Sequence, residues 1–369
     1  MSARPTVDLV AGARPNFVKI AALCHALRAI PGLRTRIVYT GQHRDHDMCA
    51  GFARELGIPR PDVRLDPEPG NHGEGTLGIR ERYGALIARG RPDATVVVGD
   101  VDSTAACALA AFERAIPVVH VEAGLRSFDR TMPEEINRLL TDAVSSLLLV
   151  SEPAGMENLA REGIPAERAY LVGNVMIDTL MRHLPDARRR SKPGRLGLSE
   201  GGYGYVTMHR PANVDDPEAL ERLLRCVAGL SLLLPMVFPV HPRTRRAMAR
   251  SGLDGLVAGA PGLRRVPPLP YVDNLSLLAS ARVVLTDSGG IQEETSVLGV
   301  PCITMRDRTE RPITMELGTS VLASSDPDAI SNAFHLALSG QWREAEPIPG
   351  WDGGAGARSG DRIAAFVCG

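Results

Sequence analysis

The chain has 369 residues, with 42 basic and 43 acidic side chains, a formal net charge of -1 and 44% hydrophobic residues. At about 150 residues per domain this length predicts two domains, and the composition excludes a disordered chain or a small disulfide scaffold. The balanced charge gives no basic field that would hold nucleic acid. All basic residues except Lys19 and Lys192 are arginine, which by itself indicates only a GC-rich coding sequence.

The six cysteines are scattered, with no C-x-x-C pair and no histidine at a metal-ligand spacing. We interpret them as small buried residues of a reducing compartment. The N-terminal residues lack the pattern of a secretion signal, and the longest apolar stretches, 147–150 and 230–240, are short or interrupted by proline. The sequence therefore predicts a cytoplasmic protein that needs no metal, no membrane and no nucleic acid.

Short aliphatic runs recur along the first half, each followed by a turn and then a helical pattern. They predict strands at Val7–Val10, Arg36–Tyr39, Ala94–Val98, Val118–Val121 and Leu147–Val150. Because buried strands alternate with helices, the expected fold class is α/β with a doubly wound parallel sheet.

The same alternation returns in the second half. Strands are predicted at Tyr205–Met208, Met236–Val240, Leu263–Val266, Val283–Thr286 and Cys302–Met305. The basic, proline-containing stretch after Leu184 shows no apolar period and predicts a surface linker. We therefore expect an N-terminal Rossmann-like domain at 1–175 and a C-terminal one at 176–354, with a final helix at about 355–369 packing back on the first. Such domains face a cleft edged by the carboxyl ends of both sets of strands.

Two glycine-containing segments in the first half could hold an anion. The G-x-G-x-x-G at 73–78 follows no strand, so its context argues against a dinucleotide site. The segment Gly12–Lys19 instead joins the end of the first strand to a helix, with Arg14 in the turn and Lys19 about one helical turn further on. An ordinary strand-to-helix turn with exposed basic residues would look the same.

The segment Thr286–Glu294 gives a sharper signal in the second half. A strand ends in Asp-Ser-Gly-Gly and a helix begins, so the Ser288 hydroxyl and free backbone N–H groups could bind a diphosphate. Glu294, one turn inside, could accept hydrogen bonds from a ribose diol. A helix cap worth about 1 kcal/mol is the alternative, and the adjacent Gly289 and Gly290 argue against it.

Carboxylates stand at the ends of two neighbouring strands of the first half. Asp100 follows Ala94–Val98, Glu122 follows Val118–Val121, and the pair Glu134–Glu135 opens a helix behind Pro133. Each alone would be interpreted as a cap or a solvated ion pair. Together they predict a site at which clustered carboxylates have separated pKa values and act as acid and base.

Histidines at strand ends add a further set of candidates. His209 and Arg210 follow the strand at 205–208, and His241 repeats this arrangement at the next strand as a weaker candidate. His120 lies inside an apolar strand and is expected to be packed. The pair His43 and His46 has no third ligand at a suitable spacing, so no metal site is predicted.

These motifs together closely resemble those of the non-hydrolysing UDP-N-acetylglucosamine 2-epimerase family. The similar segments follow one another in order along the chain: Gly12–Lys19, Thr40–Arg44, Val98–Asp100, His120–Arg126, Pro133–Arg138, Val172–Asp178, Thr207–Arg210, Thr286–Glu294 and Arg306–Pro312. The resemblance implies two Rossmann-like domains in a GT-B-like fold, a UDP-sugar substrate, no redox cofactor and a homodimer.

The resemblance implies an isomerase that interconverts UDP-GlcNAc and UDP-ManNAc. The C2 proton of a sugar is not acidic, but loss of UDP from C1 through an oxocarbenium-like transition state acidifies it and leaves 2-acetamidoglucal. UDP adds back after a proton has returned to the opposite face, so carboxylates are needed on two faces and the diphosphate needs stabilisation.

Site residues are carried over position by position. Asp100, Glu122 and Glu134 match the family's catalytic acids, although which of them removes and which returns the proton stays open, and His209 is placed with them as a partner of the diphosphate. The residues expected to bind the substrate or UDP are Arg14, Lys19, Arg138, Ser288, Gly289, Gly290, Glu294 and Arg311. In a chain that otherwise uses arginine, Lys19 suggests a tight site, and Lys192 a solvated charge.

The chain departs from the family pattern at substrate-facing positions. Gln42 and His43 match a segment that in many members contacts an activating second UDP-GlcNAc, but Asp45 replaces the usual Gln or Glu. Pro211 follows His-Arg, the 126–133 loop is short, and Asn274 stands where many members carry an aromatic residue. A modified UDP-HexNAc of antibiotic or polysaccharide biosynthesis therefore remains an alternative substrate, and a GT-B glycosyltransferase an alternative enzyme.

Overall fold

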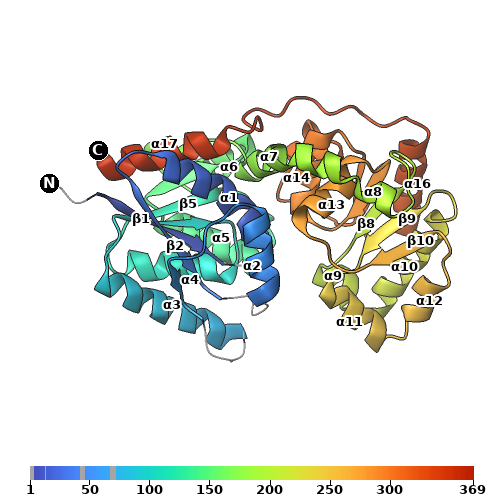
Figure 1. Ribbon diagram of the computed structural model, residues 1–369, viewed down its shortest axis with the longest axis horizontal. Helices are drawn as coiled ribbons and strands as arrows, with labels where there is room; N and C mark the ends of the chain where they lie inside the picture. The colour runs from blue at the N-terminus through green and yellow to red at the C-terminus, as the bar shows by residue number, and fades with distance from the viewer. Residues whose placement is uncertain (1–3, 13, 42–45, 67–71) are drawn as a thin grey trace. The chain divides into compact units, whose positions relative to one another are not determined.

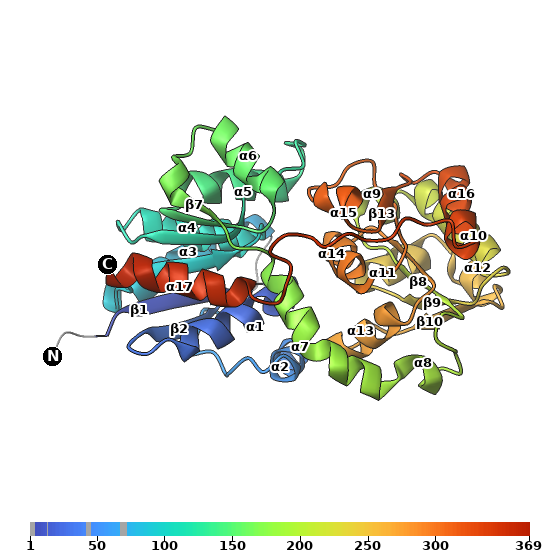
Figure 2. The same ribbon diagram turned by 90° about the horizontal axis from the view of Figure 1, so that it is seen from above.

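The computed structural model describes residues 4–12, 14–41, 46–66 and 72–369. The chain forms two compact units, each with its own sheet (Figures 1 and 2). Unit 1 contains the chain up to Thr179 together with Pro349–Gly369, and unit 2 contains Leu180–Ile348. The division falls inside one helix, four residues after the boundary expected at 175.

Unit 1 is built on a seven-stranded parallel sheet in the order β3-β2-β1-β4-β5-β6-β7. Its strands are β1 (Thr6–Ala11), β2 (Arg34–Tyr39), β3 (Val63–Arg64), β4 (Ala94–Val98), β5 (Val118–Ala123), β6 (Leu147–Val150) and β7 (Ala169–Leu171). The strand order reverses between β1 and β4, which is where doubly wound sheets bind their ligands. The aliphatic runs of β4 and β6 are buried along their whole length, as expected for strands covered on both faces.

Helices cover both faces of this sheet. They are α1 (Arg14–Ala29), α2 (His46–Glu55), α3 (His72–Arg89), α4 (Asp102–Phe112), α5 (Pro133–Val144), α6 (Pro153–Arg161), the start of α7 (Val175–Arg190) and α17 (Ala355–Cys368), with one 3₁₀ turn at Ala166–Arg168. Figure 1 shows α1 beside α17 over one face, and α3 and α4 over the other.

Unit 2 repeats this architecture with a six-stranded parallel sheet in the order β10-β9-β8-β11-β12-β13. The strands are β8 (Gly204–Thr207), β9 (Met236–Pro239), β10 (Leu263–Val266), β11 (Val283–Thr286), β12 (Cys302–Thr304) and β13 (Ser320–Leu322). The longer helices are α10 (Pro217–Leu230), α11 (Pro242–Arg250), α13 (Tyr271–Ala279), α14 (Gly289–Leu298) and α16 (Pro327–Leu338). The short ones are α8 (Lys192–Arg195), α9 (Pro211–Val214), α12 (Asp254–Ala258) and α15 (Ile313–Glu316). The expected class, α/β with two doubly wound parallel sheets, is confirmed.

The predicted surface linker after Leu184 is wrong. Residues up to Arg190 continue α7, with Pro185 inside the helix, and α8 follows immediately. Lys192 is not a solvated charge, because its Nζ lies 2.8 Å from the Asp273 carboxylate and Arg190 contacts the same carboxylate at 3.3 Å. This ion pair forms with Asp273 of α13, 81 residues further along the chain, so no local pattern could reveal it.

The structure also contains three strands that were not predicted, and it bears on the glycine motif and the cysteines. The short strands β3, β7 and β13 have two or three residues each, too few for a period-2 pattern. The G-x-G-x-x-G sequence at 73–78 lies within α3 rather than at a strand-to-helix turn, in agreement with its unfavourable context. Of the cysteines, Cys368 is exposed and Cys226 is half-buried, whereas Cys24, Cys107 and Cys302 are buried as expected.

The carboxylate of Asp178 caps the last helix of unit 1. Asp178 of α7 accepts hydrogen bonds from the backbone N–H of Ala355 (3.1 Å) and of Gly356 (2.6 Å), the first two residues of α17. Gly173 allows the tail to approach, because a Cβ there would lie 2.0 Å from the Gly350 carbonyl oxygen. Two otherwise orphaned helix donors are thereby satisfied.

Asp178→Ala is expected to lower the free energy of unfolding by about 1–2 kcal/mol, because it removes the cap of α17. Chemical unfolding measures the change, and limited proteolysis with mass analysis should show earlier cleavage before residue 355. Asp361→Ala, on the exposed side of α17, is the matched control. Equal stability of the two variants would show that Asp178 does not hold the helix.

Candidate functional site

The candidate site of unit 1 lies at the carboxyl ends of β4 and β5. Gly99 directly follows β4 and has a φ of 68°, and Glu122 near the end of β5 has a φ of 70°. The pairing of β5 with β6 is irregular between Val121 and Ala123. A glutamate in the left-handed region costs on the order of 1–3 kcal/mol, and such strain is typical of functional positions.

The strained glutamate is held by a buried lysine. The Nζ of Lys19, in the second turn of α1, forms an ion pair with Glu122 Oε2, and the side chains are 9% and 4% exposed. A Cβ at position 99 would lie 3.2 Å from Lys19 Nζ, so the ammonium group fills the space beside Gly99. A guanidinium is wider and would meet this backbone, which supports a specific role for lysine here.

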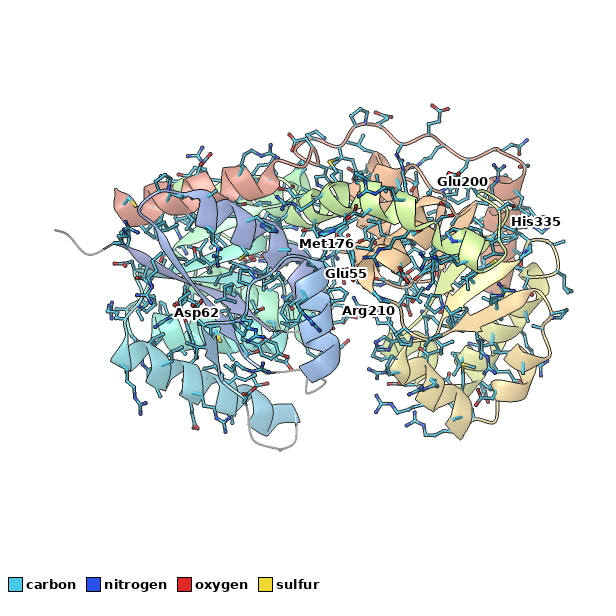
Figure 3. All side chains as sticks on the ribbon, in the orientation of Figure 1. Glu55, Asp62, Met176, Glu200, Arg210 and His335 are labelled. Carbon is cyan, nitrogen blue, oxygen red and sulfur yellow. The ribbon has the colours of Figure 1, made fainter. Side chains whose placement is uncertain are left out.

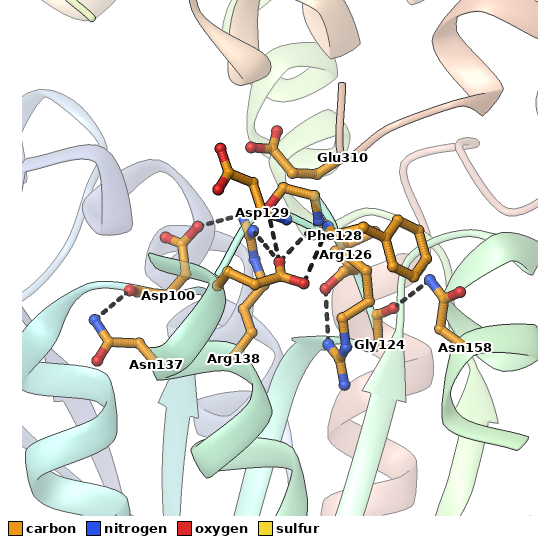
Figure 4. A network of polar contacts seen from close by, with 12 residues as sticks. Asp100, Gly124, Arg126, Phe128, Asp129, Asn137, Arg138, Asn158 and Glu310 are labelled. Atoms are coloured by element: carbon orange, nitrogen blue, oxygen red, sulfur yellow. Dashed lines mark hydrogen bonds and ion pairs between the residues drawn. The ribbon is translucent and has the colours of Figure 1, made fainter. Parts of the chain in front are cut away.

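A second carboxylate and cation meet at the end of β4. Asp100 forms an ion pair with the buried Arg138 of α5, and Asn137 donates a hydrogen bond to the Asp100 carbonyl oxygen at 2.9 Å (Figure 4). Asn137 also donates to Asp102 at 3.0 Å. The structure thus brings two predicted residues, Asp100 and Arg138, into contact. The two ion pairs, Lys19 with Glu122 and Arg138 with Asp100, thus lie at adjacent strand ends.

The two glutamates that open α5 differ in their environment. Glu135 is buried and accepts hydrogen bonds from Ser127 N (2.8 Å), Ser127 Oγ (2.9 Å) and Phe128 N (3.1 Å). It therefore anchors the loop before the helix, in which Phe128 has a φ of 58°. Glu134 lies in the same first turn of α5 and is partly exposed, so its carboxylate is the more accessible of the two.

In unit 2, His209 is held at the end of β8 by an aspartate that the sequence analysis did not select. The Nδ1 of His209 lies 3.0 Å from Asp287 Oδ1, while the backbone N–H groups of His209 and Arg210 both donate to Asp287 Oδ2 at 2.8 Å (Arg210 is labelled in Figure 3). Burial alone would raise the pKa of Asp287, but the hydrogen bond and charge of His209 and these backbone donors hold it below its usual value. The contact of Asp287 with Nδ1 therefore orients the ring. The position of Asp287 directly after β11 is the sequence signal by which it could have been found.

Neighbouring residues complete this histidine site. Asn213 donates to Asp287 Oδ2 (3.1 Å) and to the Met305 carbonyl oxygen (3.0 Å). The His241 ring lies 5.1 Å from the His209 ring, and its Nδ1 accepts from Arg243 N at 3.2 Å as the cap of α11.

Asn274, which departs from the family pattern, accepts a hydrogen bond from the Tyr205 hydroxyl at 2.5 Å.

The start of α14 carries the predicted diphosphate residues. Ser288 is the N-cap residue and is half-buried, and among the described residues its side chain makes no capping hydrogen bond. A Cβ on Gly289 would lie 2.6 Å from Arg311 Nη1, so this glycine makes room for an arginine of the protein itself. The buried Arg311 also contacts Glu293 (2.7 Å) and Glu310 (3.3 Å), and its position against the α14 terminus is set by these carboxylates.

Glu294 occupies a different environment from its neighbour Glu293. It is buried and accepts a hydrogen bond from the Tyr271 hydroxyl at 3.0 Å. Burial raises the pKa of Glu294 to about 7, the Tyr271 hydrogen bond lowers it in part, and the charge of Glu293 raises it further. A carboxyl group that changes charge near neutral pH is therefore held one turn inside the helix.

Three predicted residues lie wholly or partly outside the described part of the chain. The side chain of Arg14, at the start of α1, lies outside the part of the chain that is described, as do Gln42 and His43. In the described ranges, histidine, cysteine, aspartate and glutamate side chains form no group of three that could hold a metal ion. No helix of those ranges has both the length and the hydrophobicity needed to cross a bilayer.

Comparison with known proteins gives one consistent family. The family model described as UDP-N-acetylglucosamine 2-epimerase matches residues 25–364. The UDP-N-acetylglucosamine 2-epimerase of Methanocaldococcus jannaschii is 34% identical over 362 residues, covering 97% of both chains. The UDP-2,3-diacetamido-2,3-dideoxy-D-glucuronate 2-epimerase of Pseudomonas aeruginosa is 37% identical over 362 residues, covering 97% of this chain and 98% of the other.

Solved structures agree with these relatives. The crystal structure of the M. jannaschii UDP-GlcNAc 2-epimerase with UDP-GlcNAc and UDP has a TM-score of 0.88 and 33% identity, covering 98% of this chain and 99% of that one. The Neisseria meningitidis UDP-GlcNAc 2-epimerase bound to UDP-GlcNAc also has a TM-score of 0.88, with 27% identity, covering 99% and 100%. The GT-B-like fold expected for the chain is thereby confirmed.

The environment of Glu294 predicts a pH-dependent stability. Its pKa is about 7 in the folded chain against the ordinary 4.5, so the stability that this group contributes is complete below pH 4.5 and is lost as the pH rises to about 7. Glu294→Gln keeps an acceptor for Tyr271 and should be more stable than the parent chain by up to about 3 kcal/mol at pH 8, but not at pH 4.5. Urea unfolding at both pH values, with Glu200→Gln as an exposed control, measures this difference; a constant offset between the pH values would contradict it.

Proposed function

The chain belongs to the UDP-N-acetylglucosamine 2-epimerase family of isomerases, and from this premise we propose that it interconverts UDP-GlcNAc and UDP-ManNAc. The observation that carries the proposal is the pair of carboxylates at adjacent strand ends of unit 1, each bonded to a buried cation, Lys19 with Glu122 and Arg138 with Asp100. Carboxylates held in this way are suited to move a proton at one carbon atom.

The proposed reaction begins with cleavage of the C1–O bond, in which the bonding electrons leave with UDP. A carboxylate of unit 1 takes the C2 proton, and the C2–H electrons form the C1–C2 double bond of 2-acetamidoglucal. Return of a proton to C2 on the other face and attack of the UDP oxygen on C1 complete the inversion. Atoms and electrons balance without an oxidant, and Asp100, Glu122 and Glu134 are the groups proposed to carry the proton.

The leaving diphosphate is assigned to residues of unit 2. With Nδ1 bonded to the ionised Asp287, His209 can present its other ring nitrogen to a phosphate oxygen, and the ring is 31% exposed. The start of α14 adds the Ser288 hydroxyl and backbone N–H groups of Gly289 and Gly290. Stabilisation of the negative charge on the departing UDP lowers the barrier to C1–O cleavage.

The identity of the sugar has a second candidate. The P. aeruginosa relative acts, by its name, on a diacetamido-glucuronate, and its identity to this chain is slightly higher than that of the M. jannaschii enzyme. We propose UDP-GlcNAc first because the relatives whose solved structures contain UDP-GlcNAc resemble unit 1 and unit 2 over their whole length. Both nucleotide sugars should therefore be offered to the purified protein.

The reaction is tested by incubation with each UDP-sugar in D2O, followed by proton NMR. Epimerisation of UDP-GlcNAc should give UDP-ManNAc with deuterium at C2. Elimination also predicts that an ¹⁸O label in the C1–O–P bridge becomes distributed over the β-phosphate oxygens. Intact UDP binding without epimer and without exchange would remove the epimerase proposal, and turnover of only the diacetamido sugar would replace the substrate.

Glu122→Gln should lower the rate of C2 exchange at least about 100-fold, since an amide cannot accept the proton, while the Kd of UDP stays within about threefold. Isotope exchange by NMR and calorimetric titration with UDP measure the two effects. Glu157→Gln on the exposed surface of α6 is the control. Unchanged exchange in Glu122→Gln would exclude this residue from the reaction.

Lys19→Arg keeps the charge beside Glu122 but places a wider group against Gly99. We expect a loss of at least about tenfold in kcat, because small displacements of a reacting group are costly. Steady-state kinetics check the prediction, with Arg28→Lys near the end of α1 as a comparison for the reverse exchange. Normal kinetics in Lys19→Arg would mean that the choice of lysine has no functional reason.

A further inference from the structure

His120 lies inside β5 with no exposed surface and joins three parts of unit 1. Its Nδ1 lies 2.6 Å from Asp142 Oδ1, on α5, and its Nε2 lies 2.9 Å from the carbonyl oxygen of Gly99, at the end of β4. The sequence predicted a packed histidine, and the burial confirms this. Its Nε2 hydrogen bond, however, reaches the backbone on which Asp100 stands.

The partners determine where the protons of the ring are. A carbonyl oxygen only accepts, so Nε2 must carry a hydrogen. Asp142 Oδ2 accepts from Gly124 N (3.1 Å) and from Arg126 Nη2 (2.7 Å). Burial would raise the pKa of Asp142, but the charges and hydrogen bonds of His120 and Arg126 hold it below its usual value. The ring thus donates through Nε2 to Gly99, and the short contact at Nδ1 joins it to Asp142.

Asp142 is itself held in place by a buried cation. Arg126 binds Asp142 through Nη2 and, through Nε and Nη2 at 2.7 Å each, Glu162. The 2.6 Å contact of His120 Nδ1 with Asp142 thus belongs to a network of four side chains that hold one another in position.

The network holds both strand ends on which the proposed acids stand. Through Nε2 it fixes the peptide of Gly99, which has a φ of 68° and directly precedes Asp100. Through Asp142 it fixes the N–H of Gly124, two residues after the strained Glu122. The backbone N–H of Gly99 also donates to the Val121 carbonyl oxygen at 3.0 Å, so the two ends are bonded to each other.

We propose that His120 is a positioning residue: bonded at both ring nitrogens, it fixes the backbone that presents Asp100 and Glu122 to the sugar. The role rests on the epimerase function proposed above. His120 does not touch the reacting carbon, so its removal should affect the rate of proton transfer and leave UDP binding, assigned to unit 2, unchanged.

The hydrogen bond to Gly99 is measured on the parent protein by NMR with ¹⁵N-labelled histidine. The His120 signals, identified by their loss in His120→Gln, should show a proton on Nε2 that exchanges slowly with solvent. An unprotonated Nε2 would overturn this hydrogen bond. This measurement needs no substrate, so it gives a result even if the proposed function fails.

Two variants separate positioning from simple structural damage. His120→Asn keeps a donor near the Nδ1 position, toward Asp142, and loses the donor to Gly99; His120→Gln places its donor near the Nε2 position. We expect His120→Asn to lower kcat for C2 exchange about 100-fold, with KM and the UDP Kd within about threefold, and His120→Gln to recover at least about tenfold of this loss.

Thermal unfolding of both variants shows whether they fold. Parental kcat in His120→Asn, or equal losses in the two variants together with weakened UDP binding, would overturn the positioning role. If His120→Asn does not fold, a parental UDP Kd with a reduced kcat in His120→Gln supports the role, and a parental kcat there overturns it. Failure of the parent chain to turn over either UDP-sugar would instead refute the proposed function.

Discussion

The ion pair between Lys19 and Glu122 is the interaction around which unit 1 is arranged. It lies beside the reversal of strand order, and it joins the helix after β1 to the end of β5 across the intervening end of β4. Both side chains are almost fully buried, so each charge depends on the other, since an isolated buried charge would be strongly unfavourable. Glycine is favoured at position 99 because the backbone there is left-handed and a Cβ would lie 3.2 Å from the lysine ammonium.

Neighbouring polar residues stabilise the strained backbone of this arrangement. Glu122 and Phe128 both have left-handed backbones although they carry side chains, and each is flanked by a polar network. Asp142 holds the backbone after Glu122, and Glu135 holds the N–H of Phe128. Strain of this kind persists only where surrounding contacts determine the conformation. The proposed acids therefore stand on a backbone that the rest of unit 1 keeps fixed.

In unit 2, one aspartate holds two strand ends and a histidine ring in position. Asp287 gathers two backbone N–H groups, the Asn213 amide and the His209 ring, and thereby connects the ends of β8 and β11. Glu293 and Glu310 hold Arg311 against Gly289 in the same way. In both units, carboxylates that follow or flank strand ends orient the groups available for chemistry. The buried Glu294 differs because its hydrogen-bond donor, the Tyr271 hydroxyl, carries no positive charge.

The sequence indicated the two α/β halves, most strands and the family, because β-branched runs and strand-end motifs are local patterns. Strands such as Ala94–Val98 and Leu263–Val266 are found as expected. Asp100 and Arg138, both selected from the sequence for other reasons, are in contact at the end of β4. The linker after Leu184, the ion pair of Lys192, and the partners of His120 and His209 could not be read from it. The contacts of the three side chains involve residues more than 20 positions away, Asp142 for His120, Asp287 for His209 and Asp273 for Lys192. The folded chain brings these partners together, because a buried charge or a left-handed residue is stabilised by neighbours in space and not by neighbours in the chain.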